Sequence, residues 1–262
     1  MTEPTVLVER TGDVLSLTLN RPHRLNALTP ELLGAFDDAF RTVGDDLVAV
    51  VVRGAGRAFS SGHDLKWSAE DDRNTRMSEE DLAETTDALH QITRRIRACP
   101  VPVVSRVHGY AIGGGAEIAL SADLIVAAES AVFRFSETSV GLVVTNGFTA
   151  LLPRSAGAAV AKEIIMLGER FTAAQAHTWG LVNRVVADDN LDAEVDKIVS
   201  TLRDKSPIAL RLAKRLLDQG WQGSPEEVMS RETAASVEAA LSADAREAAA
   251  AFAEGRPPRF RP

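Results

Sequence analysis

Short apolar runs mark several strands in the first part of the chain. Residues 5–9 and 14–19 are rich in β-branched residues and leucine, and Thr11–Asp13 (TGD) between them is typical of a hairpin turn. Two further apolar runs, at residues 47–52 and 102–107, are long enough for buried strands. The pattern therefore predicts a sheet that begins with a hairpin and continues with buried strands.

Apolar residues at helical spacing appear between these strands. Thr29 followed by Pro30 supplies a capping hydroxyl and a first helical residue that needs no donor. Ser78 is placed to cap another helix, which Pro100 ends. The expected buried faces are Leu32, Leu33, Phe36, Ala39 and Phe40 in the first helix and Leu82, Leu89, Ile92 and Ile96 in the second.

Strand patterns become rare toward the C-terminus. Short strands are expected at residues 123–128 and 132–135, and helices dominate from Ala158 onward. Residues 191–262 contain no convincing strand, and their last expected helix is long and rich in alanine. We therefore predict two parts, a strand-rich region over residues 1–190 and a helical region over residues 191–262.

Composition narrows the class of protein. The 262 residues suffice for one compact domain with a substantial core. The formal net charge of −8 argues against a nucleic-acid surface, which needs concentrated Lys and Arg. Cys99 is the single cysteine, and no apolar run has the length of a signal peptide or a membrane span. We therefore expect a soluble cytoplasmic protein.

The candidate chemistry lies in His108–Ser121, HGYAIGGGAEIALS. Its three glycines stand between an expected strand and an expected helix, where bare main-chain N–H groups suit a developing oxyanion. Glu117 falls in the first turn of that helix, and Glu137 follows on a separate segment. Two carboxyls near one polarised carbonyl can exchange protons with adjacent carbons. From the pattern alone, a tight turn, a helix-dipole partner and a solvated glutamate remain open.

A longer stretch, GYAIGGGAEIALSADLIVAAESAVFRFSETSVGL, resembles the signature of the crotonase family, the enoyl-CoA hydratase/isomerase family. Further matches lie at residues 20–28, 58–65, 171–185 and 252–260, in family order. The resemblance implies an α/β fold in which a spiral of ββα units precedes a C-terminal helical trimerisation region. No internal sequence repeat reveals such a spiral directly, and a helical cover on the chain's own core is the alternative for the tail.

The resemblance also implies the reacting groups. A thioester oxygen would be held by the main-chain N–H groups of His63 and Gly114, so the imidazole of His63, where a small residue is common, need not interfere. Glu117 would be the base that activates water and Glu137 the proton donor. The implied contacts with the substrate or its coenzyme A portion are Arg24, Ser61, Asp64 and Leu65, with Phe252 and Arg256 reaching the adenine end in a neighbouring subunit.

The function expected from this resemblance is reversible addition of water to a 2-trans-enoyl-CoA, giving a 3-hydroxyacyl-CoA. No metal or permanently bound cofactor is expected, because coenzyme A is part of the substrate, and the expected assembly is a homotrimer or homohexamer. The alternatives are a Δ3-Δ2 enoyl-CoA isomerase, or another enolate-forming acyl-CoA lyase or hydrolase. A non-catalytic acyl-CoA-binding protein is a more distant one.

One segment departs from the pattern. Residues 142–148, LVVTNGF, stand where hydratases of this family usually carry a turn rich in proline and glycine. In the family this loop lines the acyl and water side of the site. We therefore expect the bulkier residues here to alter the acyl-chain preference or the placement of water.

The sequence motifs do not support three other classes of protein. A dinucleotide fingerprint would need a third glycine after Gly54 and Gly56, but Phe59 stands there and no helix pattern follows. Ser60, Ser61, His63 and Asp64 suggest a serine hydrolase, yet triad members normally come from separate segments and a G-x-S-x-G elbow is missing. No H-E-x-x-H or paired-cysteine spacing supports a metal site.

Overall fold

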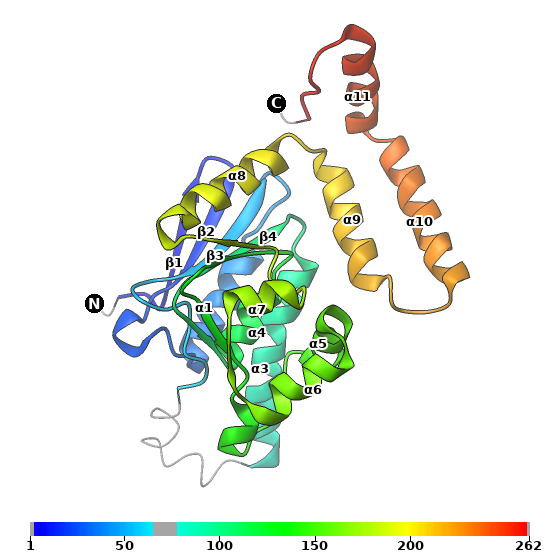
Figure 1. Ribbon diagram of the computed structural model, residues 1–262. Coiled ribbons are helices and arrows are strands. Elements are labelled where there is room, and N and C mark those ends of the chain that lie inside the picture. The colour runs from blue at the N-terminus through cyan, green and yellow to red at the C-terminus, as the bar shows by residue number, and fades with distance from the viewer. Residues whose placement is uncertain (1–2, 65–77, 261–262) are drawn as a thin grey trace.

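A six-stranded sheet forms the frame of the molecule, which is described by a computed structural model over residues 3–64 and 78–260 (Figure 1). The strand order is β1-β2-β3-β4-β6-β9. The first pair is the predicted antiparallel hairpin, and every later neighbour pair is parallel. The strands are β1 (Val6–Thr11), β2 (Val14–Leu19), β3 (Ala49–Gly54), β4 (Val103–Val107), β6 (Leu124–Ala128) and β9 (Arg184–Val186).

Both faces of this sheet are buried, which explains the unbroken apolar runs of its parallel strands. Val50 and Val52 of β3 belong to the larger core cluster, whereas Val51 between them belongs to a second cluster on the opposite face. The larger cluster packs under α1 (Pro30–Arg41), α3 (Glu79–Ala98) and α4 (Gly114–Leu120). The second packs under α8 (Leu191–Arg203), which lies across the other side of the sheet in Figure 1.

A second sheet has three strands, and two of them lead into the segments that contain Glu117 and Glu137. Its order is β5-β7-β8, and the stacked rings of Phe133 and Phe171, 5.6 Å apart, join β7 to β8. Helices and one 3₁₀ turn follow its strands in the chain, and the loop that departs from the family pattern connects that turn to the next helix. The elements are β5 (Tyr110–Ile112), β7 (Val132–Arg134), β8 (Arg170–Thr172), η3 (Glu137–Val140), α5 (Phe148–Ala156), α6 (Ala158–Leu167) and α7 (Ala173–Thr178).

The C-terminal helices form an arm beside the body of the molecule (Figure 1). They are α9 (Pro207–Gln219), α10 (Pro225–Ala240) and α11 (Ala243–Glu254). The expectation of one long alanine-rich helix was wrong, because α10 ends before Leu241 and a second helix follows. Ser242 caps this second helix by accepting a hydrogen bond from the amide of Ala245. Val237 and Leu241 of this arm are 54% and 74% exposed in the single chain.

Most expected elements are present with shifted ends. Thr29 caps α1 and Pro30 is its first residue, as predicted. The strand expected at residues 47–52 lies two residues later, at Ala49–Gly54. Leu82 was expected on the buried face of α3, but half of it is exposed, whereas Ile92 and Ile96 are buried as expected. The remaining short elements are η1 (Pro22–Arg24) and η4 (Asp188–Asn190).

Among the residues that the structure describes, no helix is both long enough and apolar enough to cross a membrane.

One buried ion pair fastens α9 to the body. The Lys214 Nζ lies 2.7 Å from a carboxylate oxygen of Asp123 and donates to the carbonyls of Ile96 and Val101 at 2.7 and 3.3 Å. Burial raises the pKa of the Asp123 carboxyl, and the Lys214 ammonium opposes that rise. Removing the ammonium would leave the largely buried Asp123 carboxyl without its ion-pair partner and would remove one donor from each of the two carbonyls.

We therefore expect Lys214→Met to lower the free energy of unfolding by about 3 kcal/mol. Urea unfolding followed by circular dichroism measures this change. Lys162→Met on the exposed side of α6 is the matched control, with an expected change below about 0.5 kcal/mol. Equal stabilities for the two variants would contradict the anchoring role of Lys214.

Candidate active site

Two loops far apart in the sequence run side by side at the centre of the site. The amide of Ser60 donates to the Tyr110 carbonyl at 2.9 Å, and the amide of Ile112 donates to the Ser60 carbonyl at 3.0 Å. This ladder continues from β5 into the glycine triplet that begins α4. The loop that contains Ser60 is therefore held in fixed register with the loop that contains the triplet.

Glycines make this close approach possible. A Cβ on Gly62 would lie 2.4 Å from the Ile112 carbonyl oxygen and 3.4 Å from the Gly114 nitrogen, and Gly62 has a positive φ of 81°. A Cβ on Gly115 would lie 2.7 Å from both the carbonyl oxygen and the Cβ of Ser60. Because neither position has room for a side chain, the main chain of residues 62–63 reaches the start of α4.

The two expected oxyanion donors lie on these loops. Gly114 is the first residue of α4, where N–H groups have no partner within the helix. His63 bridges Leu28 in parallel fashion, with hydrogen bonds from Leu28 N to Gly62 O and from Asp64 N to Leu28 O. In such a bridge the amide of His63 itself faces away from Leu28. The His63 imidazole is half-buried, and burial lowers its pKa, so the ring is neutral at pH 7.

Glu117 lies in the first turn of α4, as the sequence predicted, and is 1% exposed. Its Oε1 accepts the main-chain N–H of Thr145 at 2.7 Å. Its Oε2 accepts the Thr145 hydroxyl at 2.9 Å and the Asn146 side-chain amide at 2.6 Å. Three donors on two oxygens suit an ionised carboxylate that is fixed in position.

Glu137, the first residue of η3, is in a different environment. Its Oε2 is buried and lacks a hydrogen-bond partner among the described residues. Burial, followed by the nearby charge of Glu117, raises the pKa of Glu137 from 4.5 to about 7. Glu137 is therefore partly protonated at neutral pH.

The two carboxyls border the same pair of glycines. A Cβ on Gly113 would lie 3.1 Å from the Glu137 Oε1, and a Cβ on Gly114 would lie 3.9 Å from the Glu117 Oε2. Unlike environments at two neighbouring acids are a common arrangement for separating a base from an acid. The site can therefore offer main-chain donors, a fixed carboxylate and a carboxylic acid at one place.

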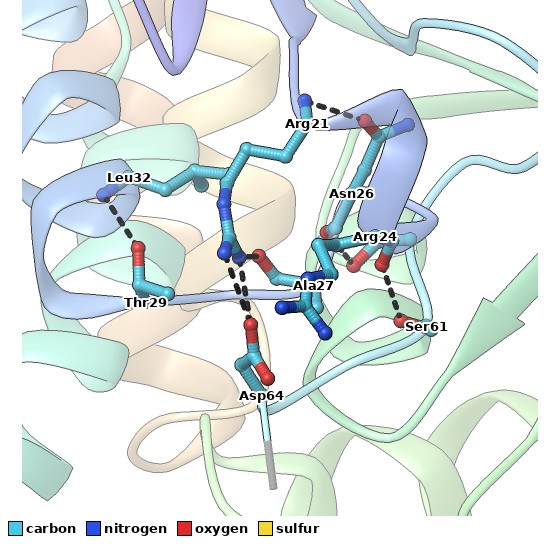
Figure 2. A network of polar contacts seen from close by, with 9 residues as sticks. Arg21, Arg24, Asn26, Ala27, Thr29, Leu32, Ser61 and Asp64 are labelled. Atoms are coloured by element: carbon cyan, nitrogen blue, oxygen red, sulfur yellow. Dashed lines mark hydrogen bonds and ion pairs between the residues drawn. The ribbon is translucent and has the colours of Figure 1, made fainter. Parts of the chain in front are cut away.

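Of the residues expected to contact the coenzyme A portion, Arg24, Ser61 and Asp64 cluster beside η1 (Figure 2). Arg24 is exposed, and the Ser61 hydroxyl donates to its carbonyl at 3.4 Å. The Asp64 carboxylate is 3.0 Å from the Arg21 guanidinium, and their side chains are 8% and 16% exposed. Asp64 thus helps to hold this loop against η1 through Arg21, a partner that the sequence analysis missed.

Phe252 and Arg256 lie on the C-terminal arm, away from the two loops of the site in their own chain. Phe252 is 90% exposed on α11, at the far end of the arm (Figure 1). Arg256 follows the same helix and is paired with Glu247 and Glu254. Leu65 lies outside the described residues. Contribution of Phe252 and Arg256 from a neighbouring subunit stays a prediction.

Two contacts of Glu117 were not foreseen. Thr145 and Asn146 belong to the segment that departs from the family pattern, and both turn their polar groups inward. The one sequence signal was a pair of polar residues in an otherwise apolar stretch, LVVTNGF. Asn146 also forms part of the wall of a cavity of about 820 Å³ that lies between α3, α5 and α9.

Comparison with known proteins agrees with this fold. The enoyl-CoA hydratase/isomerase family model matches residues 9–262. The 2,3-dehydroadipyl-CoA hydratase of Escherichia coli K12 is 34% identical over 98% of each chain, and the 1,2-epoxyphenylacetyl-CoA isomerase of the same organism is 34% identical over 94% of each. A crystal structure of an enoyl-CoA hydratase from Polaromonas sp. JS666 superimposes with a TM-score of 0.91 at 32% identity, covering 98% of this chain and 99% of the other.

The architecture is the crotonase fold. The chain belongs to the enoyl-CoA hydratase/isomerase family.

The contact between Gly115 and Ser60 can be tested by adding one methyl group. We expect Gly115→Ala to destabilise the protein by about 2 kcal/mol, because the new Cβ would overlap main-chain and side-chain atoms of Ser60. Gly34→Ala on the exposed side of α1, where a Cβ meets nothing within 4 Å, should instead stabilise the protein by up to about 1 kcal/mol. Urea unfolding of both variants measures the difference, and two changes of the same sign would refute the close approach.

The raised pKa of Glu137 has a consequence for stability. The folded chain holds this proton more tightly than the unfolded chain, so its stabilising contribution is complete below about pH 4.5 and is lost as the pH rises through about 7. We expect Glu137→Gln to be more stable than the natural protein at pH 8, with a much smaller advantage at pH 5. Thermal unfolding at the two pH values measures this, and an advantage that does not change with pH would be inconsistent with a raised pKa.

Proposed function

We propose that this protein is an enoyl-CoA hydratase that adds water reversibly to a 2-trans-enoyl-CoA and forms a 3-hydroxyacyl-CoA. The observation that carries the proposal is the unlike pair of acids, Glu117 and Glu137, beside one pair of glycines. Addition of water to a conjugated thioester needs one group that accepts a proton from the water attacking Cβ and another group that supplies a proton to Cα. A site with one fixed carboxylate and one protonated carboxyl meets both needs.

In the proposed reaction the thioester oxygen accepts hydrogen bonds from the amides of His63 and Gly114. As the water oxygen bonds to Cβ, the electrons of the double bond move onto the thioester, and the two amides stabilise the resulting enolate. Each such donor contributes on the order of 3 kcal/mol to stabilisation of a transition state. Because these donors belong to the main chain, a histidine at position 63 is compatible with this role.

The different environments of the two acids assign one proton transfer to each. Glu117 accepts one proton of the attacking water, and Glu137 delivers its proton to Cα of the enolate. The product gains one O–H group at Cβ and one C–H bond at Cα, so the balance is one water added. Dehydration runs through the same steps in reverse, with Glu137 removing the Cα proton.

An isomerase is the second candidate, and a specific observation favours it. The Glu117 carboxylate is already occupied by Thr145 and Asn146, whereas an oxygen of Glu137 has no partner among the described residues. A single mobile proton at Glu137 would suffice to move a double bond between the Δ3 and Δ2 positions. One 34% identical relative carries the name of a hydratase and another that of an isomerase, which is consistent with either chemistry.

The proposed substrate is an acyl-CoA thioester, which contains coenzyme A as part of the molecule. Arg24, Ser61 and Leu65 are proposed to lie near the coenzyme A portion. We further propose that three copies assemble, or six as a pair of trimers, so that Phe252 and Arg256 reach a neighbouring site. The arm that carries them presents exposed apolar residues, which supports a packing role. A cytoplasmic location and the absence of a permanently bound cofactor belong to the same proposal.

The test is loss of the conjugated enoyl-thioester absorbance with short, medium and branched substrates. We expect Glu117→Gln and Glu137→Gln each to lower kcat for hydration by about 100-fold or more, because each removes one proton-transfer group. Glu129→Gln, an exposed carboxyl at the end of β6, is the matched control and should leave kcat unchanged.

The pH dependence adds a second readout. Since the donor at Cα must be protonated, kcat/KM for hydration should fall as the pH rises through about 7. A natural protein that binds coenzyme A thioesters but hydrates none of them would remove the hydratase assignment. Conversion of a 3-enoyl to a 2-enoyl thioester by the same protein would select the isomerase instead.

A further inference from the structure

The loop between η3 and α5 is built in an unusual way. Leu142 and Val143 are 51% and 76% exposed, while the third apolar residue of the loop, Val144, is 8% exposed. The polar member Asn146 is 3% exposed and faces the buried Glu117. Two apolar residues of this loop thus face solvent while the polar Asn146 is buried, so burial of apolar surface does not explain the inward contact of Asn146.

Asn146 has an unfavourable backbone conformation and a buried oxygen atom that lacks a partner among the described residues. Its φ of 53° lies in the left-handed region, which Asn tolerates better than most residues but less well than glycine. Its Oδ1 is buried and has no hydrogen-bond partner among the described residues. Stability alone would favour a glycine at this position, because glycine removes both the backbone strain and the buried oxygen.

The contact with Glu117 is specific. Thr145 donates its main-chain N–H to Oε1, and Asn146 donates its side-chain amide to Oε2 at 2.6 Å. Donors on both oxygens oppose rotation of the carboxylate. The main-chain N–H and the hydroxyl of Thr145, which donates to Oε2 at 2.9 Å, would remain with any residue at position 146. The third donor to Glu117 belongs to the Asn146 side chain.

We propose that Asn146 is a positioning residue that fixes the orientation of the Glu117 carboxylate for its reaction with water. The assignment rests on the proposed function, in which both acids act. Hydration needs Glu117 in place to receive a proton from water. Exchange of a Cα proton with solvent needs only Glu137 and the oxyanion donors, so Asn146 matters for the first reaction and not for the second.

Two substitutions separate this role from a structural one. Asn146→Gly removes the side-chain donor and suits the positive φ. Asn146→Asp keeps the shape but places an acceptor against Glu117. The matched controls are Asn190→Gly and Asn190→Asp, at an exposed asparagine before α8 whose side chain makes no capping hydrogen bond.

The experiment compares two reactions of the whole protein. Hydration of crotonyl-CoA gives kcat and KM. Deuterium uptake at Cα of butyryl-CoA in D₂O gives the exchange rate: the Cα–H bond breaks, its proton passes to the Glu137 carboxylate and exchanges with solvent, and a deuteron returns to Cα.

We expect Asn146→Gly to lower kcat for hydration about 10- to 100-fold, the usual effect of misplacing a reacting group by a fraction of an ångström to an ångström. Its KM and its exchange rate should stay within about twofold of the natural protein, since thioester binding and Glu137 are untouched. Asn146→Asp should lose more activity at pH 8 and recover part of it at lower pH, where a protonated carboxyl can donate the same hydrogen bond. The Asn190 variants should match the natural protein in both reactions.

Two results would refute the assignment of Asn146 as a positioning residue. If Asn146→Gly keeps its hydration kcat within twofold, or if hydration and exchange fall together in both Asn146 variants, then Asn146 only supports the loop and the assignment is refuted. A natural protein that hydrates no enoyl thioester would defeat the proposed function, and this assignment with it. The two failures are therefore distinguishable by whether the natural protein is active.

Discussion

The closeness of two glycine-containing loops is the constraint on which the site depends. Gly62 lies against Ile112 and Gly114, and Gly115 lies against Ser60, at separations that exclude any side chain. The hydrogen bonds between Ser60 and β5 hold this contact in register. Because the contact is made by main chain against main chain, the N–H groups near it are placed by the fold itself and do not depend on the choice of side chain.

The same contact explains how two carboxyls share one site and still differ. Glu117 lies on the helix that begins at the contact and is met by donors from the loop before α5. Glu137 lies on a short turn after β7, where burial is not matched by a donor to its Oε2 from the described residues. Desolvation therefore raises the pKa of Glu137, while hydrogen bonds hold the carboxylate of Glu117 in one orientation.

Local patterns in the sequence were enough for the elements and for the placement of Glu117. Thr29 and Pro30 define the start of α1 through contacts within four residues, and the hairpin of β1 and β2 follows from its turn. Such signals act over short distances, so they survive without knowledge of the fold. The division of the alanine-rich helix at Ser242 was missed, although a serine cap is a local signal of the same kind.

The contacts that complete the site join residues distant in sequence. Thr145 and Asn146 meet Glu117 across 28 and 29 positions, and Arg21 meets Asp64 across 43. No periodicity links such pairs, and each depends on how the two sheets place their loops. The pairing of Asn146 with Glu117 also needs a left-handed backbone at Asn146, which the sequence analysis did not predict.

The central claim is that the amides of His63 and Gly114 hold one thioester oxygen between Glu117 and Glu137. A crystal structure with acetoacetyl-CoA, an acyl-CoA that cannot be hydrated, tests this claim most directly. The account predicts the thioester oxygen about 2.7–3.1 Å from both amide nitrogens, with the two carboxyls beside Cα and Cβ. A thioester oxygen that approaches neither amide, or an acyl group remote from the two acids, would contradict it.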